Sequence, residues 1–106
     1  MKGQVKNHSS KTLWVLVSKD TEMYAYKLPS GYQSPSQIDA DGFCAVDDTP
    51  IDDYIGWIKI VDICTAEVKD AAKQLTSECM FCGKVKDKKF GKVKFVYEDD
   101  WGEPIT

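Results

Sequence analysis

The sequence contains no arginine: all fourteen basic residues are lysine, against seventeen acidic residues and a net charge of −3. Arginine is the side chain best suited to bidentate recognition of carboxylate, phosphate and guanine groups. With an isoelectric point near 5.1, this absence argues against a specific nucleic-acid partner. Long apolar runs are also absent. The longest, residues 13–17, has five residues, whereas a membrane-spanning helix needs about 20. We therefore expect neither a nucleic-acid partner nor a membrane partner.

A secretion signal is likewise missing from the first residues. Residues 1–11 are polar throughout, and the apolar run that follows is shorter than the apolar region of a signal peptide, about 7–15 residues. The chain has four cysteines, fewer than a disulfide scaffold of this size would carry. We therefore predict a cytoplasmic protein whose cysteines are free thiols that pack as small apolar side chains.

The rest of the composition is that of a packed domain, with 42% hydrophobic and 11% aromatic residues. A chain of 106 residues buries roughly two-thirds of its unfolded surface, so we expect a single domain over residues 1–106. Residues 12–18 are apolar on both faces, which predicts a strand buried on two sides. Residues 23–28 are predicted as its hairpin partner. Residues 3–6 predict a short edge strand, and residues 92–97 a half-buried strand.

One segment has helical periodicity. Val68, Ala71, Ala72 and Leu75 fall at positions i, i+3, i+4 and i+7, which predicts a short helix over about residues 66–76. We therefore predict a mainly β fold: an antiparallel β-sandwich or partly open barrel of roughly six to seven short strands, with this helix over one end or face. The alternative is an α+β roll, in which the helix packs across a single curved sheet.

The charges are unevenly distributed along the chain. Between Leu28 and Ile58 there are six aspartates and no lysine. A surface of one sign attracts partners of the opposite sign, and aromatic side chains are typical interface anchors. We therefore predict an acidic contact surface, interleaved with aromatic residues, for a cationic protein partner. Its residues are Asp39, Asp41, Asp47, Asp48, Asp52, Asp53, Tyr32, Phe43 and Tyr54.

A lysine-rich stretch predicts a second, basic face. Six lysines and one acid lie between Lys84 and Lys94, around an expected turn at residues 87–91. The two flanking strands are therefore predicted to form a C-terminal hairpin. Lysines on such a hairpin also protect an exposed edge strand against aggregation. The predicted basic face consists of Lys84, Lys86, Lys88, Lys89, Lys92 and Lys94.

Two short motifs resemble metal-binding patterns. Residues 79–83 read C-M-F-C-G, the form of a zinc knuckle, which makes Cys79 and Cys82 candidate ligands. A structural zinc needs four ligands, and the other two cysteines stand alone in the sequence. Residues 39–42 read D-A-D-G and match only part of a calcium-binding loop. We interpret this second motif as turn-forming residues.

These features predict a non-enzymatic binding module without a cofactor. His8 is the sole histidine and lies far in sequence from every cysteine, so no cysteine–histidine nucleophile is expected. The favoured function is protein–protein interaction of the immunity- or adaptor-protein kind. One alternative is a small-ligand or glycan-binding β-sandwich that uses Trp101 and Tyr32. A second alternative is a small domain with a structural metal at Cys79 and Cys82.

Overall fold

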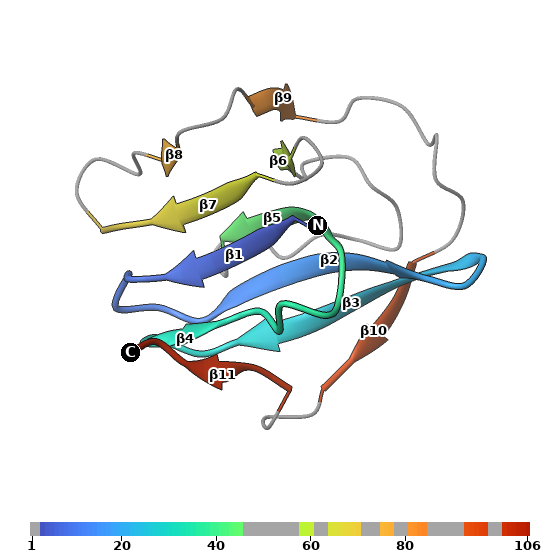
Figure 1. Cartoon of the computed structure of the whole chain (residues 1–106), viewed down its shortest axis with the longest axis horizontal. Coiled ribbons are helices and arrows are strands. Elements are labelled where there is room, and N and C mark those ends of the chain that lie inside the picture. Colours follow the sequence, from blue (N-terminus) through green and yellow to red (C-terminus); the bar gives the residue numbers. More distant parts are fainter. Residues whose placement is uncertain are drawn as a thin grey trace.

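The computed structural model describes residues 3–45, 58–60, 64–70, 75–77, 81–84, 93–97 and 101–106, with the backbone alone for residues 45, 75–77 and 81–84. These residues are mainly β and form two sheets, neither of which closes on itself (Figure 1). The strands are β1 Gln4–Asn7, β2 Leu13–Lys19, β3 Glu22–Leu28, β4 Tyr32–Gln33, β5 Ala40–Ala45, β6 Ile58–Ile60, β7 Thr65–Val68, β8 Leu75–Ser77, β9 Phe81–Lys84, β10 Val93–Val96 and β11 Glu103–Pro104.

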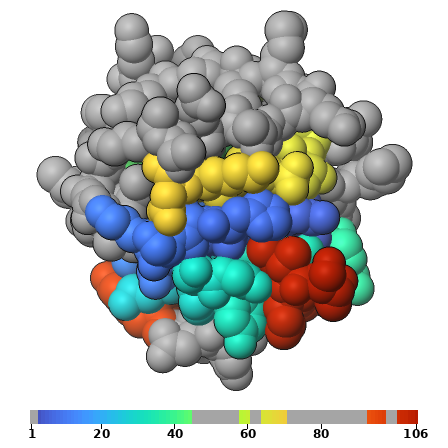
Figure 2. All heavy atoms as spheres, turned by 90° about the vertical axis from the view of Figure 1, so that its left-hand side faces the viewer, coloured from blue at the N-terminus to red at the C-terminus, as the bar shows by residue number. Residues whose placement is uncertain are grey.

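The two sheets contain six and five strands. One has the order β10-β3-β2-β5-β6-β9, and the other has the order β11-β4-β1-β7-β8. Figure 1 shows β8 and β9 at the top and β10 and β11 at the bottom. On the outer face drawn in Figure 2, β7, β1, β4 and β11 lie side by side. Most neighbouring strands are antiparallel, but β1 pairs with β7, and β3 with β10, in parallel.

The predicted central strand and its hairpin are confirmed. β2 lies inside the six-stranded sheet, and residues 13–17 are all buried. It pairs with β3 along its whole length, from Leu13↔Leu28 to Lys19↔Glu22. Asp20 makes the tight turn possible because it adopts a positive φ of 59°. Aspartate tolerates this left-handed conformation better than most residues do.

Apolar side chains collect in two clusters, one on each face of β2. The larger cluster contains Val15 of β2 together with Val5 of β1 and Ala66 of β7, so it draws on both sheets. The smaller cluster contains Trp14 of β2 together with Val93 of β10. Successive residues of a strand point to opposite faces. An unbroken apolar run in β2 therefore supplies both clusters at once.

The helix predicted over residues 66–76 is wrong in the part that the structure describes. Residues at its two ends form β7 and β8, which pair antiparallel from Ala66↔Ser77 to Val68↔Leu75. β7 also pairs with β1 along its length. A helix of about eleven residues is marginal alone, and its stripe holds two alanines with little area to bury. As a strand, β7 buries Ala66 and Val68 and gains neighbours on both sides.

No helix occurs in the described ranges. Those ranges therefore contain no helix that could span a lipid bilayer. The radius of gyration of 12.2 Å is close to the roughly 13 Å expected of a compact chain of this length.

The first strand is internal, not at an edge as the sequence pattern suggests. β1 lies between β4 and β7 in the five-stranded sheet. Val5 is fully buried, and its backbone N–H donates to the Ser34 hydroxyl oxygen at 2.8 Å. The Ser34 N–H in turn donates to the Val5 carbonyl oxygen at 2.8 Å. The neighbours of β1 come from segments about 30 and 60 residues away, and pairing at that distance leaves no local pattern.

Candidate functional site

Phe43, a predicted anchor of the acidic contact surface, belongs to the core. It lies in β5, where it pairs with Val15 of β2 and Ile58 of β6. Its side chain is only 2% exposed and packs in the larger cluster. The structure therefore places Phe43 in the core and not on the predicted contact surface. Phe43 lies on the face of β5 that packs against side chains of the other sheet, among them Val5 and Ala66, and this contact covers the ring.

The structure describes two aspartates of the predicted acidic surface, and neither is fully exposed. Asp39 is half-buried, and its Oδ1 accepts a hydrogen bond from the Gly3 N–H at 2.9 Å. Asp41 is also half-buried and lies within β5. The interpretation of residues 39–42 as a turn is wrong, because residues 40–45 form this strand. The other predicted members of this surface, Asp47, Asp48, Asp52, Asp53 and Tyr54, lie outside the described residues.

Tyr32 is the predicted contact residue that the structure does place at the surface. Its exposed fraction of 36% makes it one of two large hydrophobic side chains exposed within the described residues; the other is Tyr97. Tyr32 lies in β4, and its backbone is paired with Pro104 of β11. β4 also pairs with β1 on its other side. The Tyr32 ring is thus carried by a backbone that neighbouring strands hold in place.

The predicted basic face is divided between two distant strands. Lys84 lies in β9 and Lys94 in β10, and these are the opposite edge strands of the six-stranded sheet. The predicted C-terminal hairpin is therefore wrong, because β9 pairs with β6 and β10 pairs with β3. Its other lysines, Lys86, Lys88, Lys89 and Lys92, lie outside the described residues.

Lys94 belongs instead to a polar cluster on β3 and β10. The parallel register sets Lys94 beside Tyr24. Its Nζ donates to Glu22 Oε1 at 2.7 Å, and the Tyr24 hydroxyl donates to Glu22 Oε2 at 2.6 Å. The hydrogen bond from Lys94 is the main cause that lowers the pKa of Glu22, and the bond from Tyr24 adds to it. The bond to Glu22 raises the pKa of both Lys94 and Tyr24.

The lowered pKa of Glu22 leads to a prediction about its titration in acid. A carboxyl group with a lowered pKa in the folded state contributes stability above its unfolded pKa and loses it as pH falls through the folded pKa. Carbon-detected NMR should therefore show Glu22 titrating below the ordinary range for glutamate. The Lys94→Met variant should move this midpoint upward, whereas Lys27→Met should leave it in place. An unchanged midpoint in Lys94→Met would show that the ion pair does not form in solution.

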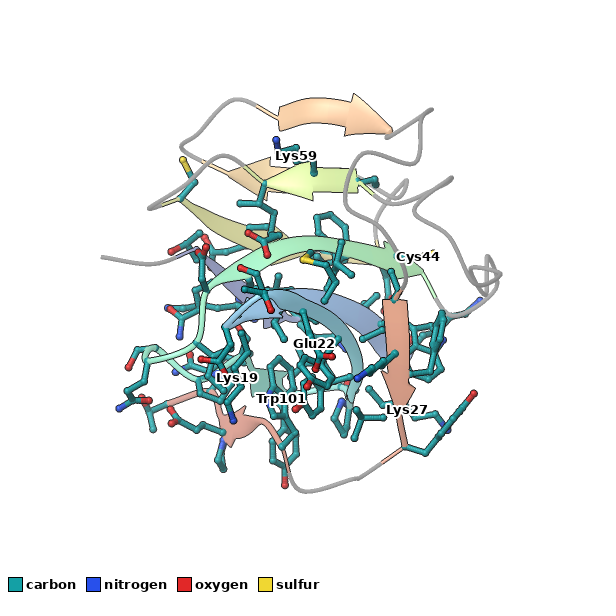
Figure 3. All side chains as sticks on the ribbon, turned by 90° about the vertical axis from the view of Figure 1, so that its right-hand side faces the viewer. Lys19, Glu22, Lys27, Cys44, Lys59 and Trp101 are labelled. Carbon is teal, nitrogen blue, oxygen red and sulfur yellow. The ribbon has the colours of Figure 1, made fainter. Side chains whose placement is uncertain are left out.

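An aromatic cluster surrounds Trp14 at the β10 edge, and no local sequence pattern marks it. The Trp14 ring meets the rings of Phe95 and Tyr97 edge-on, with centroids 5.1 Å and 5.4 Å away. The Lys27 ammonium lies 5.3 Å from the centroid of the Tyr97 ring, within the range of a cation–π contact. Figure 3 shows Lys27 beside the end of β10. Trp14 is 5% exposed, whereas Tyr97 is 65% exposed.

Trp101, expected to be free for ligand stacking, packs against the protein itself. Its ring stacks on Tyr26 with centroids 4.6 Å apart and planes 9° apart. The two rings are partly buried against the larger cluster. Figure 3 shows Trp101 among other side chains at the lower end of the molecule. This stacking occupies one face of the Trp101 ring, so the structure lends less support to the glycan-binding alternative than the sequence did.

The two cysteines whose side chains are described differ in oxidation state. Cys44 is buried and keeps its thiol outside any disulfide, as expected, but Cys64 is disulfide-bonded. The prediction of free thiols is therefore wrong for Cys64. Zinc binds the thiolate form of cysteine, so an oxidised Cys64 cannot complete a site with Cys79 and Cys82, whose side chains are not described. Among the described side chains, no group of three or more histidine, cysteine or acidic residues is placed to hold a metal.

The single histidine takes part in a surface contact between β1 and β7. His8 Nε2 lies 3.0 Å from Glu67 Oε1. Nearby, the Ser10 backbone N–H and hydroxyl both donate to the Asp70 carboxylate, at 2.9 Å and 3.1 Å. These groups are exposed and join the loop after β1 to the end of β7. Their acidic partners lie 59 and 60 residues away in sequence, so no local motif marks them.

Comparison of the chain with models of protein families, with characterised proteins and with solved structures finds no match.

Proposed function

We propose that the protein is a non-enzymatic binding module that docks a cationic partner protein through Tyr32 and the aspartates of residues 29–57. The observation that carries this proposal is the exposure of Tyr32 on a strand paired on both sides. An aromatic side chain on a preorganised backbone loses little conformational freedom when it binds. Tyrosine is also one of the residues most often found at the energetic centre of an interface.

The charge of residues 29–57 determines the kind of partner. This stretch contains six aspartates and no lysine, and it begins at the exposed Tyr32 end. Opposite charge raises the rate of encounter and rejects acidic competitors. An immunity or adaptor protein that masks a basic surface would need this combination. The function needs no cofactor and no bond-making chemistry.

The proposal also concerns the cellular compartment in which the protein functions. The sequence predicts the cytoplasm, where disulfides are rare. The disulfide bond of Cys64 instead favours a protein that functions in an oxidising compartment.

For the fold, we infer a β-sandwich, because the larger apolar cluster takes side chains from both sheets.

Binding of the partner tests the proposal through paired surface variants. We expect Tyr32→Ser to weaken partner binding by about tenfold or more. The combined change of Asp47, Asp48, Asp52 and Asp53 to serine should weaken it further and remove most of its salt dependence. Binding is measured by calorimetry with a partner recovered from native lysate on the wild-type protein.

Ser36→Ala, an exposed change in the same stretch, is the control and should bind as the wild type does. If the Tyr32 and aspartate variants also bind as the wild type does while remaining folded, residues 29–57 are not the contact surface. A partner whose own contact surface is acidic would contradict the charge argument separately.

A further inference from the structure

Lys27 holds its ammonium group against two aromatic rings, on the face of the six-stranded sheet that carries the smaller apolar cluster. Its Nζ lies 5.8 Å from the centroid of the Trp14 ring and 5.3 Å from the centroid of the Tyr97 ring. Both distances fall within the range of a cation–π interaction, about 6 Å. The two ring planes meet at 84°, with centroids 5.4 Å apart. Two aromatic walls at nearly a right angle therefore contact one positive charge.

The pairing of three neighbouring strands builds this arrangement. Lys27 of β3 stands directly opposite Trp14 of β2 in the antiparallel register. On the other side of β3, the parallel pairing with β10 runs up to Val96↔Tyr26, and Tyr97 follows directly. Trp14 is 5% exposed and Tyr97 is 65% exposed. One wall is therefore fixed within the packed sheet, and the other faces solvent.

The two rings, and no described acid, hold the Lys27 ammonium in place. Among the described residues, no carboxylate forms an ion pair with Lys27, whereas Lys94, which also lies over an aromatic ring, is paired with Glu22 at 2.7 Å. A surface lysine ordinarily keeps its ammonium in water, because this compact group is strongly hydrated. The half-buried Lys27 side chain instead directs its charge to ring faces. The site therefore accepts a cation without a charged partner.

We propose that Trp14 and Tyr97 form a binding site for a quaternary ammonium group, which Lys27 occupies while the ligand is absent. Aromatic rings are the usual partners of such groups in proteins. A quaternary ammonium has methyl groups in place of N–H donors, so it gives up less hydration than the lysine ammonium when it moves onto ring faces. Because two positive charges repel each other at this distance, the ligand displaces the Lys27 ammonium, whose flexible stem lets it move into water.

NMR titration with tetramethylammonium chloride, at an ionic strength held constant with sodium chloride, tests this site. In the free protein, ring currents should shift the ε-methylene protons of Lys27 upfield, and the probe should move them back toward the position of an exposed lysine. Lys27→Ser should bind the probe about two- to fivefold more tightly, because no lysine has to be displaced. Tyr97→Leu removes the exposed wall and should bind it more weakly by a similar factor.

Two control variants separate this site from general charge effects and from the proposed docking surface. Lys19→Ser removes the same charge from an exposed position on the same hairpin and should bind the probe as the wild type does. Tyr32→Ser changes the five-stranded sheet and should also leave probe binding unchanged. Failure of the Tyr32 docking surface would therefore not affect this test, and the reverse also holds.

A comparison of ligands tests the chemistry of recognition. Choline should bind at least about fivefold more tightly than its neutral analogue, in which carbon replaces the nitrogen. Equal binding of the two would overturn the proposal, because the rings would then offer only an apolar surface. So would a titration in which the probe moves no signal of Lys27 or Tyr97, in the wild type and in Lys27→Ser alike.

The source of the ammonium group follows from a second comparison, between choline and the amide of acetylated trimethyllysine. Tighter binding of the lysine derivative supports the site and identifies its ligand as a methylated side chain of another protein. Tighter binding of choline supports the site and identifies its ligand as a small molecule.

Discussion

The Asn7→Ala variant is expected to unfold with about 3 kcal/mol less free energy than the wild type. Asn7 is fully buried at the end of β1. Its Nδ2 donates to the carbonyl oxygens of Lys11 and Leu28, at 2.7 Å and 2.9 Å, and its Oδ1 accepts from the Ser9 N–H at 3.0 Å. Alanine removes all three hydrogen bonds, and of the three backbone groups the part-buried Lys11 carbonyl still accepts from the Ser9 hydroxyl at 3.1 Å. A buried backbone group left without a hydrogen bond costs roughly 1–3 kcal/mol, and water that enters the site recovers part of this cost.

Two variants make this result specific. Asn7→Asp keeps the acceptor toward Ser9 but presents oxygen to two carbonyl oxygens. We expect it to be at least as destabilising as alanine. Ser30→Ala removes only the hydroxyl that donates to the Ser9 carbonyl and should cost about 1 kcal/mol. Urea unfolding followed by tryptophan fluorescence measures all three. A loss below about 0.5 kcal/mol in Asn7→Ala would show that water replaces the side chain fully.

Loss of the Cys64 disulfide is expected to cost about 2–5 kcal/mol of stability. The bond constrains the unfolded chain, so its removal raises the entropy of that state. Dithiothreitol should therefore lower the midpoint of thermal unfolding of the wild type. The Cys64→Ala variant should start at the lower midpoint and respond little to reductant. Calorimetry with and without dithiothreitol provides the comparison.

Cys44→Ala is the matched control, because Cys44 is buried but takes no part in a disulfide. It should cost only the small loss of packing, and it should keep the wild-type response to reductant. A thiol count on the unfolded, unreduced wild type checks the bond itself. Four reactive thiols per chain, the full cysteine content, would contradict the disulfide and restore the free-thiol prediction.

The parts of the fold that the sequence predicts are those decided by local patterns. The run in residues 13–17 is apolar at every position, and only a strand covered on both faces can accommodate it. The sequence also predicts residues 23–28 as the hairpin partner, and β3 pairs with β2 along its whole length. The helix prediction for residues 66–76 is wrong because small apolar residues at helical spacing also fit a strand. There the pairing of β7 with β1 decided the outcome.

The candidate site was less predictable because its contacts are distant in sequence. Phe43 and Tyr32 are both aromatic residues in an acidic stretch, and each lies on a strand with neighbours on both sides. Only the packing of Phe43 in the larger apolar cluster separates core from surface. Lys94 meets Glu22 across 72 residues, and Trp14 meets Tyr97 across a similar separation. Both contacts depend on the parallel pairing of β10 with β3. Hydrophobic periodicity carries no information about which strand becomes the neighbour of which.

That parallel pairing governs the order in which the chain can acquire its structure. Val93 pairs with Met23, 70 residues earlier, and Pro104 of β11 pairs with Tyr32 at a similar distance. Contacts this remote pay a large loop-closure entropy before they return any energy, so folding is expected to take milliseconds to seconds. Until β10 is synthesised, one side of β3 is an open template for other nascent chains. β10 thus protects the β2–β3 hairpin.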